Sequence, residues 1–173
     1  MKRKAKLLMS LVVVGATAGC LLTGCEKKDN TNDNNNTNAS QTVKTPANKL
    51  AEIFEKEVKN TKDLKKIGEA LRDSEIITYK VDVMELKKGD YFPGFDKEIK
   101  NYKKLVAVNP MISVQPFALY LFETDKPEEL EKELKENHNL SWNICTSADE
   151  MVTRVEGNIV FFVMSPKSFE KEE

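Results

Sequence analysis

The stretch "FALYLFETDKPEELEKEL", residues 117–134, decides the predicted fold. Its first six residues are apolar without interruption, which is typical of a central strand covered on both faces. The charged half that comes next has Thr124 or Asp125 as its candidate N-cap and Pro127 in its first turn, so it predicts a helix. Leu130 and Leu134 are spaced to form the buried side of that helix. The stretch therefore predicts a sheet with a helix beside it.

Upstream of this stretch, residues 48–72 predict an amphipathic helix. Apolar side chains recur there at spacings near three and four, while Glu and Lys fill the other face. Asn60-Thr61 is a candidate interruption at which Thr61 caps a second segment. Alternating β-branched residues predict a strand at 76–84. Residues 96–103 are expected to form one or two helical turns.

Shorter extended segments are predicted on either side of the central strand. Residues 105–108 read as a short strand that Asn109-Pro110 ends, and residues 112–115 read as extended. Alternation of Leu140, Trp142 and Ile144 with polar residues predicts another strand.

The C-terminal stretch carries two conflicting signals. Ser147 to Glu150 resembles a capping box and favours a helix. Residues 152–155, then Gly157-Asn158, then residues 159–164 favour a hairpin, and Val, Thr and Phe are good strand formers. The hairpin is the favoured interpretation, and its second strand must be interior because an exposed run of this kind aggregates.

Together these elements predict an α+β domain over residues 47–173. Its sheet is mostly antiparallel, with an N-terminal helix and a second helix packed on it.

The N-terminus has the layout of a secretory signal over residues 1–24. A basic cluster from Lys2 to Lys6 is followed by an apolar run from Leu7 to Leu22 and then by small residues. The run is short for a membrane-spanning helix, which needs about 20 residues. A retained transmembrane anchor is the alternative interpretation.

Leu22-Thr23-Gly24-Cys25 resembles the lipobox of bacterial lipoprotein precursors, which signal peptidase II cleaves. The resemblance implies that a diacylglyceryl group is attached to the thiol of Cys25 and that cleavage precedes this residue. It also implies a lipid-anchored protein on the extracytoplasmic face of the cell membrane. Thr17-Ala18-Gly19-Cys20 is a second match, so Cys20 stays open as the alternative attachment site. Two acyl chains suffice for stable anchoring where one is marginal.

Residues 25–46 are expected to be a disordered, Asn/Thr-rich tether, because they have almost no large apolar side chain to offset their ordering entropy. Removal of residues 1–24, which carry four basic residues and no acidic one, leaves 23 basic and 28 acidic residues and a net charge of −5. Such a charge gives no electrostatic attraction toward nucleic acid or toward anionic lipid headgroups, so no nucleic-acid partner is expected.

No pattern typical of catalysis is present in the sequence. His138 is the single histidine and Cys145 the single cysteine beyond the signal region, so no metal site and no cofactor are expected. Cys145 is interpreted as a small buried residue and His138 as a surface residue at a helix end. A Cys145–His138 nucleophile and base pair is the catalytic alternative. The chain is therefore expected not to be an enzyme.

One loop is a candidate binding site. Tyr91, Phe92 and Phe95 surround Pro93-Gly94, and aromatic loop residues can anchor a protein partner or a sugar ring. The alternative is that they cover one end of the core, and Trp142 is likewise expected to be core.

The stretches at 110–115 and 155–160 are similar to small uncharacterised lipoproteins of Gram-positive bacteria, a resemblance that implies no activity. The hypothesis is a membrane-anchored lipoprotein whose non-catalytic domain binds an envelope protein. Binding of a small molecule or glycan is the alternative, and an envelope hydrolase is the least supported one.

Overall fold

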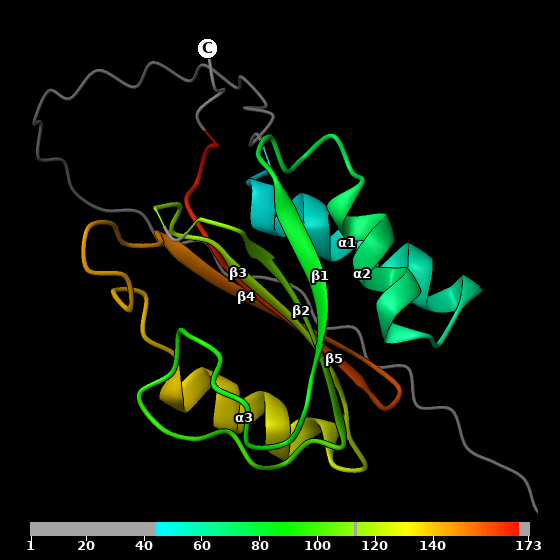
Figure 1. Cartoon of the computed structure of the whole chain (residues 1–173). Coiled ribbons are helices and arrows are strands. Elements are labelled where there is room, and N and C mark those ends of the chain that lie inside the picture. Colours follow the sequence, from blue (N-terminus) through cyan, green and yellow to red (C-terminus); the bar gives the residue numbers. More distant parts are fainter. Residues whose placement is uncertain (1–43, 113, 170–173) are drawn as a thin grey trace, which may run out of the picture. The chain divides into compact units, whose positions relative to one another are not determined.

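The computed structural model describes residues 44–112 and 114–169. This part of the chain forms three helices and one five-stranded sheet, so the predicted α+β class is confirmed. All neighbouring strands are antiparallel, in the order β1-β2-β3-β5-β4 (Figure 1). The elements are α1 (Pro46–Asn60), α2 (Leu64–Arg72), β1 (Val81–Leu86), β2 (Lys104–Pro110), β3 (Ala118–Glu123), α3 (Pro127–Asn137), β4 (Glu150–Glu156) and β5 (Ile159–Ser165).

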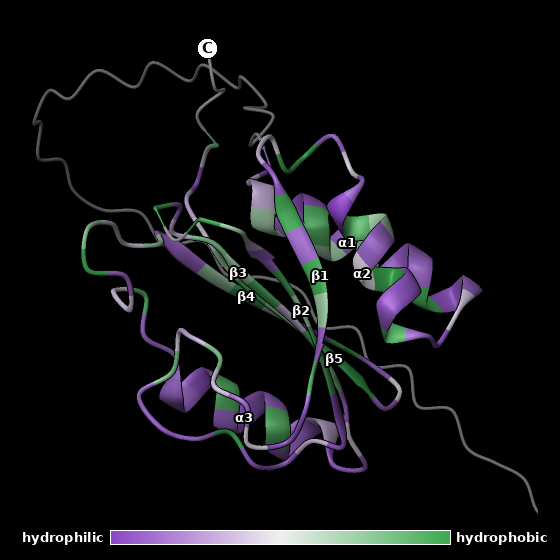
Figure 2. Cartoon of the chain, in the orientation of Figure 1, coloured by the Kyte–Doolittle hydropathy of each residue, from purple (hydrophilic) through white to green (hydrophobic). Residues whose placement is uncertain are grey.

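Helices cover both faces of this sheet. α1 and α2 pack on one face and α3 packs on the other (Figure 1). Gly68 allows α2 to approach closely, because a β-carbon there would lie 3.0 Å from Cγ1 of Val83 and 3.2 Å from Cγ1 of Val106. Apolar and polar bands alternate on the helices (Figure 2), as expected where one side is buried.

β3 and β5 contribute to a core on each face, because successive side chains of a strand point in opposite directions. Leu119 and Phe161 join the core under α1 and α2, where Phe161 stacks on Phe54 with ring centroids 5.2 Å apart. Tyr120 and Phe162 join the core under α3. Burial on both faces explains the continuous apolar runs and confirms the predicted central strand.

β4 and β5 form the favoured C-terminal hairpin, which is therefore confirmed. Gly157 and Asn158 join the two strands, and Gly157 has the positive φ, 63°, that a tight hairpin turn requires. The alternative helix over 147–156, which the capping box would begin, is not formed; the backbone N–H of Asp149 instead donates to the carbonyl of Ser165 at 3.0 Å. β5 is buried along its whole length, as expected.

The sheet has two ends with different surroundings. We call proximal the end formed by Val81, Pro110, Ala118 and Ser165, and distal the end formed by Leu86, Lys104, Glu123 and Ile159. The chain leaving α1 lines a groove at the distal end. The 15 residues of α1 span about 22 Å, and the helix runs along the sheet from the proximal side (Figure 1). The first described residues, Lys44 and Thr45, therefore lie at the proximal end (Figure 1).

The predicted N-terminal helix is divided at the expected place, but the predicted cap is wrong. Asp63 caps α2, because its carboxylate accepts from the backbone N–H of Lys65 at 3.0 Å. The hydroxyl of Thr61 accepts instead from the N–H of Asp63, at 3.1 Å. Thr61 has extended backbone angles and lies in the connection, two residues before the cap.

The strand predicted at 76–84 begins too early, since β1 starts at Val81. Ile77 is buried, and Ile76 and Tyr79 pack against the core under α1 and α2 without pairing in the sheet. Their alternation therefore comes from packing of a loop. β2 is longer than predicted and includes the Asn109-Pro110 pair that was expected to follow it, whereas the extended segment expected after it is not part of a strand.

The strand predicted at 140–145 is also wrong. Leu140 and Trp142 pack against the core under α3, whereas Ile144 is fully exposed. The alternation thus belongs to a loop that places two side chains inward without a strand partner.

The helical turns predicted at 96–103 are absent, because a carboxylate from α3 binds this backbone instead. Glu133 accepts from the N–H of Lys100 at 3.0 Å and from that of Asn101 at 3.3 Å. The cap predicted for α3 is wrong too. Lys126 occupies the N-cap position, and the hydroxyl of Thr124 accepts from its N–H at 3.0 Å. Pro127 begins the helix.

Candidate functional site

The aromatic loop between β1 and β2 lies over the core under α3. Phe92 and Phe95 are half-buried there; the ring of Phe92 is centred 5.2 Å from that of Tyr120, and the ring of Phe95 lies 5.0 Å from that of Phe162. Tyr91, in contrast, is 87% exposed. The structure brings Phe92 and Phe95 together as part of the core and leaves Tyr91 in solvent.

Hydrogen bonds attach this loop to the end of α3. The N–H of Asp96 donates to the carbonyl of Asn137 at 2.9 Å, and the N–H of Asn139 donates to the carbonyl of Gly94 at 2.9 Å. Gly94 has a φ of 99°, and a β-carbon there would overlap Cε of Met164. The loop is thus held in one position, and only glycine fits its closest approach to the sheet.

A hollow of about 260 Å³ lies beside the aromatic loop. Asp90, Tyr91, Phe92 and Tyr102 are among its lining residues. Burial raises the pKa of the Tyr102 hydroxyl above its ordinary value, so this group keeps its proton at neutral pH. The hollow can hold a small ring-shaped ligand against the exposed face of Tyr91.

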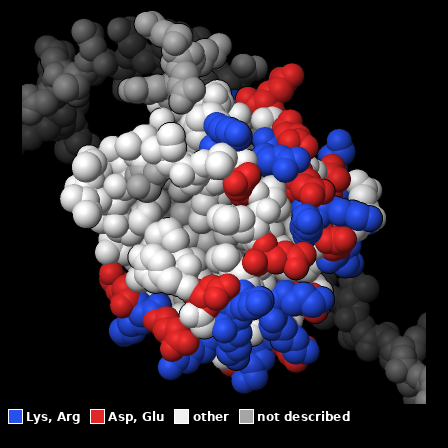
Figure 3. All heavy atoms as spheres, viewed as in Figure 1, with Lys and Arg blue, Asp and Glu red and all other residues white. Residues whose placement is uncertain are grey.

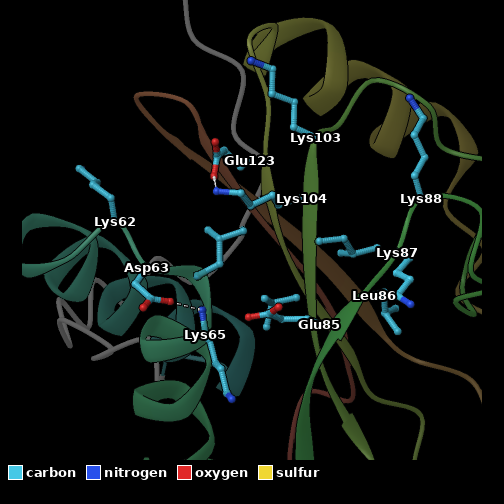
Figure 4. Close-up of a pocket in the computed structure, with 13 residues that line it drawn as sticks. Lys62, Asp63, Lys65, Glu85, Leu86, Lys87, Lys88, Lys103, Lys104 and Glu123 are labelled. Carbon is cyan, nitrogen blue, oxygen red and sulfur yellow. Dashed lines mark hydrogen bonds and ion pairs between the residues drawn. The ribbon is translucent and has the colours of Figure 1, made fainter.

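A larger groove of about 660 Å³ opens at the distal end (Figure 4). It runs between the α1–α2 connection on one side and the ends of β1 and β2 on the other. We call it the lysine groove, because six of its lining residues are lysines and three are acidic. Its charged lining residues are Lys62, Asp63, Lys65, Glu85, Lys87, Lys88, Lys103, Lys104 and Glu123.

Local structure positions these charges. The cap at Asp63 places Lys65 in the first turn of α2. On the other side, β1 pairs with β2 so that Glu85 lies opposite Val106. The chain then leaves β1 at Lys87 through a turn, in which the carboxylate of Asp90 accepts from the N–H of Lys87 at 2.7 Å. Residues far apart in sequence therefore meet around one groove.

Half of the lysines already have partners. Lys62 donates to a backbone carbonyl of α1 at 2.7 Å. Lys103 forms an ion pair with Asp125 at 2.6 Å, and Lys104 forms one with Glu123 at 2.9 Å. The hydrogen bond with Glu123 raises the pKa of the Lys104 ammonium group. The charges of Lys103 and Lys104 are neutralised locally, so these two lysines contribute less to attraction of a further anion, whereas Lys62 keeps its charge.

Lys65, Lys87 and Lys88 form no ion pair within residues 44–112 and 114–169. Lysines and carboxylates are interspersed along this part of the surface (Figure 3). With six lysines and three acidic residues, the lining carries a net charge of +3. The groove can therefore attract an anionic group although the chain as a whole is acidic.

The groove was not predicted from the sequence, because the net charge of the whole chain does not indicate where lysines cluster on its surface. The available signal was the pair of Lys-Lys dipeptides at 87–88 and 103–104, one after a strand and one before the next. The end of one strand lies beside the start of its antiparallel neighbour, so these four lysines line the same groove. The predicted boundaries of the first strand were displaced, which concealed that convergence.

The structure places His138 at the C-terminal end of α3 and Cys145 in the loop before β4. Cys145 is exposed, so its interpretation as a buried residue is wrong. The Nδ1 atom of His138 lies 2.8 Å from the carbonyl oxygen of Lys135 at the end of α3. Trp142 packs partly buried against the core under α3, as expected.

Two glutamates on the acidic face of α3 form hydrogen bonds with neighbouring parts of the domain. Glu131 accepts from Nζ of Lys135 at 2.7 Å and from the hydroxyl of Thr153 at 2.6 Å. These hydrogen bonds, that from Lys135 first, hold the pKa of the Glu131 carboxyl below its ordinary value. Glu131 and Glu133 thus connect α3 to β4 and to the loop before β2.

The predicted anchor lies outside the described residues. This applies to Cys25, to the alternative Cys20, and to Leu22, Thr23 and Gly24. Within the part that the structure describes, no helix has the length and apolarity needed to cross a bilayer, and no group of three His, Cys, Asp or Glu residues is placed to hold a metal ion. No protein-family model matches the chain, and neither does any curated protein or solved structure.

Proposed function

We propose that this chain is a lipid-anchored protein on the extracytoplasmic face of a bacterial cell membrane, and that its domain is a non-catalytic interaction module. The basic cluster, the apolar run and the lipobox-like residues 22–25 support the anchor. The lysine groove is the observation that carries the second part of the proposal. Lys65, Lys87 and Lys88 present three ammonium groups beside it that no carboxylate of the described domain neutralises.

The partner is an acidic surface of another envelope protein. Asp63, Glu85 and Glu123 alternate with the lysines of the groove and would repel a uniformly anionic polymer. A protein surface can place its own basic groups opposite these carboxylates and its acidic groups opposite the lysines. Charge patterns of this kind give specificity and a fast association rate more than high affinity.

In-cell photo-crosslinking tests the interaction. A photo-crosslinking amino acid replaces Lys87 in the groove, and in a matched strain it replaces the exposed Lys132 on α3. Mass spectrometry then identifies what each position captures. We expect one acidic envelope protein at position 87 that is absent at position 132. Identical captures at the two positions would count against the groove as an interface.

Two charge-reversed variants sharpen this experiment. Lys65→Glu with Lys88→Glu reverses two of the three unpaired positive charges of the groove, and a Glu in the first turn of α2 is favourable for the helix. Lys56→Glu with Lys132→Glu makes the same change of net charge elsewhere on exposed positions. We expect only the first pair to abolish the capture. If captured material is a wall polymer instead of a protein, the proposed partner class is wrong.

The anchor has its own test. Cys25→Ala should release the protein from the membrane fraction and remove the acyl mass from the mature N-terminus. An acylated, membrane-bound Cys25→Ala protein would move the attachment site to Cys20. A wild-type protein that carries no acyl group would refute the anchor.

The hollow beside the aromatic loop favours a second candidate function, binding of a small molecule or glycan. Tyr91 is exposed over a hollow of about 260 Å³ that Phe92 and Tyr102 also line. Sugar rings stack on aromatic faces of this kind. A glycan array tests this function. Binding that is abolished in Tyr91→Ala and unchanged in the lysine variants would favour glycan binding over the protein interaction.

A further inference from the structure

Large apolar side chains are exposed together at the proximal end. Met111, Ile112 and Val114, between β2 and β3, have 58%, 70% and 60% of their surface exposed. Ile144, in the loop before β4, is fully exposed. The hydroxyl of Thr146 donates to the carbonyl of Val114 at 3.2 Å, so the two loops lie side by side. We call Met111, Ile112, Val114 and Ile144 the apolar rim.

Three residues of the apolar rim, Met111, Ile112 and Val114, line a depression of about 470 Å³ together with Tyr79, Lys80 and Pro110. Figure 3 shows a broad area without charged side chains on one side of the domain, whereas lysines and carboxylates crowd the other side and the distal end. Monomeric soluble domains rarely group exposed apolar side chains in this way, and such groups mark protein or membrane contacts.

The position at which the described chain begins favours a membrane contact for the apolar rim over a protein contact. Helix α1 begins at the same end of the sheet as the apolar rim (Figure 1). Thr45 lies twenty positions after Cys25 in the sequence. A flexible segment of that length has a root-mean-square span of about 25 Å. An acylated Cys25 would therefore hold this end of the domain at an average distance from the bilayer that is comparable to that span.

We propose that the domain docks through the apolar rim on the lipid bilayer that anchors it. This inference rests on the lipid anchor of the proposed function. The tether converts docking into an intramolecular event with a high effective concentration, so four exposed side chains suffice where a free protein would not stay bound. The interfacial region of a bilayer accepts apolar loop tips without a matching shape, and Lys80 can extend its ammonium group toward the headgroups.

Docking orients the domain. Strands of six or seven residues extend about 20 Å from the proximal to the distal end. With the apolar rim on the lipid, the lysine groove faces away from the membrane, where a partner protein of the envelope has access to it.

Cys145 provides a probe at the apolar rim, because it is exposed and adjacent to Ile144. The mature lipidated protein is reconstituted in phosphatidylcholine vesicles that contain a nitroxide-labelled lipid, and an environment-sensitive fluorophore is attached at Cys145. Mass spectrometry verifies the labelled position. A matched protein carries Cys145→Ser and Lys88→Cys, which moves the fluorophore to the distal end. We expect nitroxide quenching and a blue shift at position 145 and neither at position 88.

Ile112→Asp with Val114→Asp should abolish the quenching at position 145 while the acyl chains keep the protein on the vesicles. Thermal unfolding of this variant establishes that it is folded. Equal quenching at both positions, quenching at position 88 alone, or no quenching in a vesicle-bound protein would each overturn the docking. Failure of the anchor is recognised separately, since an unacylated protein does not float with the vesicles.

Discussion

The proximal and distal ends of the sheet are built from opposite chemistry. At the proximal end, the ring of Phe117 packs edge-on against Tyr79 and Phe169, with centroids 6.0 Å and 5.7 Å apart. At the distal end, Lys104 and Glu123 form an ion pair whose lysine is largely exposed. Buried rings contribute strongly to stability, whereas exposed ion pairs contribute little.

This difference indicates that the residues that stabilise the fold and the residues proposed to bind a partner lie at opposite ends of the strands. Substitutions in the buried part of the proximal end should unfold the domain. Substitutions in the lysine groove should leave it folded and change only what it binds. The apolar rim is a third case, because its side chains lie at the stable end but contribute little to the core.

The largest effect is expected from Phe117→Ala. Phe117 is buried against the two neighbouring rings, so its truncation should lower the free energy of unfolding by about 3–5 kcal/mol. Urea denaturation measures this loss. Lys104→Ala at the distal end is the control and should leave the denaturation midpoint nearly unchanged. Similar losses in the two variants would contradict the conclusion that the proximal end contributes more to stability than the distal end.

The second largest effect is expected from alkaline pH, which should lower the stability of the domain through Tyr79 at the proximal end. Burial raises the pKa of the Tyr79 hydroxyl, so the folded chain keeps a proton that the unfolded chain releases. Stability is then constant below the unfolded pKa of about 10 and falls above it, by up to about 1.4 kcal/mol per pH unit for this group. Urea denaturation across that range should show a smaller decline in Tyr79→Phe. An unchanged decline would show that Tyr79 ionises freely in the folded state.

Charge reversal in the lysine groove should affect binding alone. Lys65→Glu with Lys88→Glu is expected to weaken the affinity for the captured partner about tenfold or more at low salt, because two exposed attractions become repulsions. The difference from wild type should shrink as salt screens the charges. Binding is measured by titration calorimetry and folding by thermal melting. A lowered melting temperature would mean that the groove also supports the fold.

Tyr79→Phe should stabilise the domain modestly at neutral pH. The Tyr79 hydroxyl is buried and has no hydrogen-bond partner within the described residues. Burying a hydroxyl group without a hydrogen bond costs free energy. Its removal should therefore raise the free energy of unfolding by about 1 kcal/mol. Tyr120→Phe is the matched control, because the Tyr120 hydroxyl donates to the carbonyl of Pro93 at 2.8 Å and its loss should destabilise. Destabilisation in both variants would point to a partner for Tyr79.

The smallest effect on stability is expected from Ile144→Asp. Its side chain is fully exposed, so the free energy of unfolding should change by less than about 0.5 kcal/mol. Urea denaturation again measures the change. A larger loss would place Ile144 in the core and remove it from the apolar rim.

How far the sequence predicts this fold depends on where each element is buried. The strands at 117–122 and 159–164 are predicted to within one residue of β3 and β5, since burial on both faces leaves an uninterrupted apolar run. The loop at 140–145 has the sequence pattern of a strand, because Leu140 and Trp142 face inward from it as strand residues would. Period-two alternation reports burial of alternate side chains and does not report pairing in a sheet.

The lysine groove lay beyond prediction for a different reason. Its two sides come from the α1–α2 connection and from the β1–β2 edge, and the register of Glu85 against Val106 brings them into one surface. Neither side is unusual by itself. The candidate loop was found from its aromatic composition, but only the packing of Phe92 and Phe95 distinguishes core residues from the exposed Tyr91.

The sequence by itself determined the class of fold, the central strand, the C-terminal hairpin and the break in the N-terminal helix. These features leave local signatures, because hydrophobic period and turn residues act over a few positions. Only the tertiary structure decided which residues cap the helices, which lysines converge and which apolar side chains stay exposed at the proximal end. Such choices depend on contacts between segments distant in the chain, and those contacts exist only once the sheet has paired.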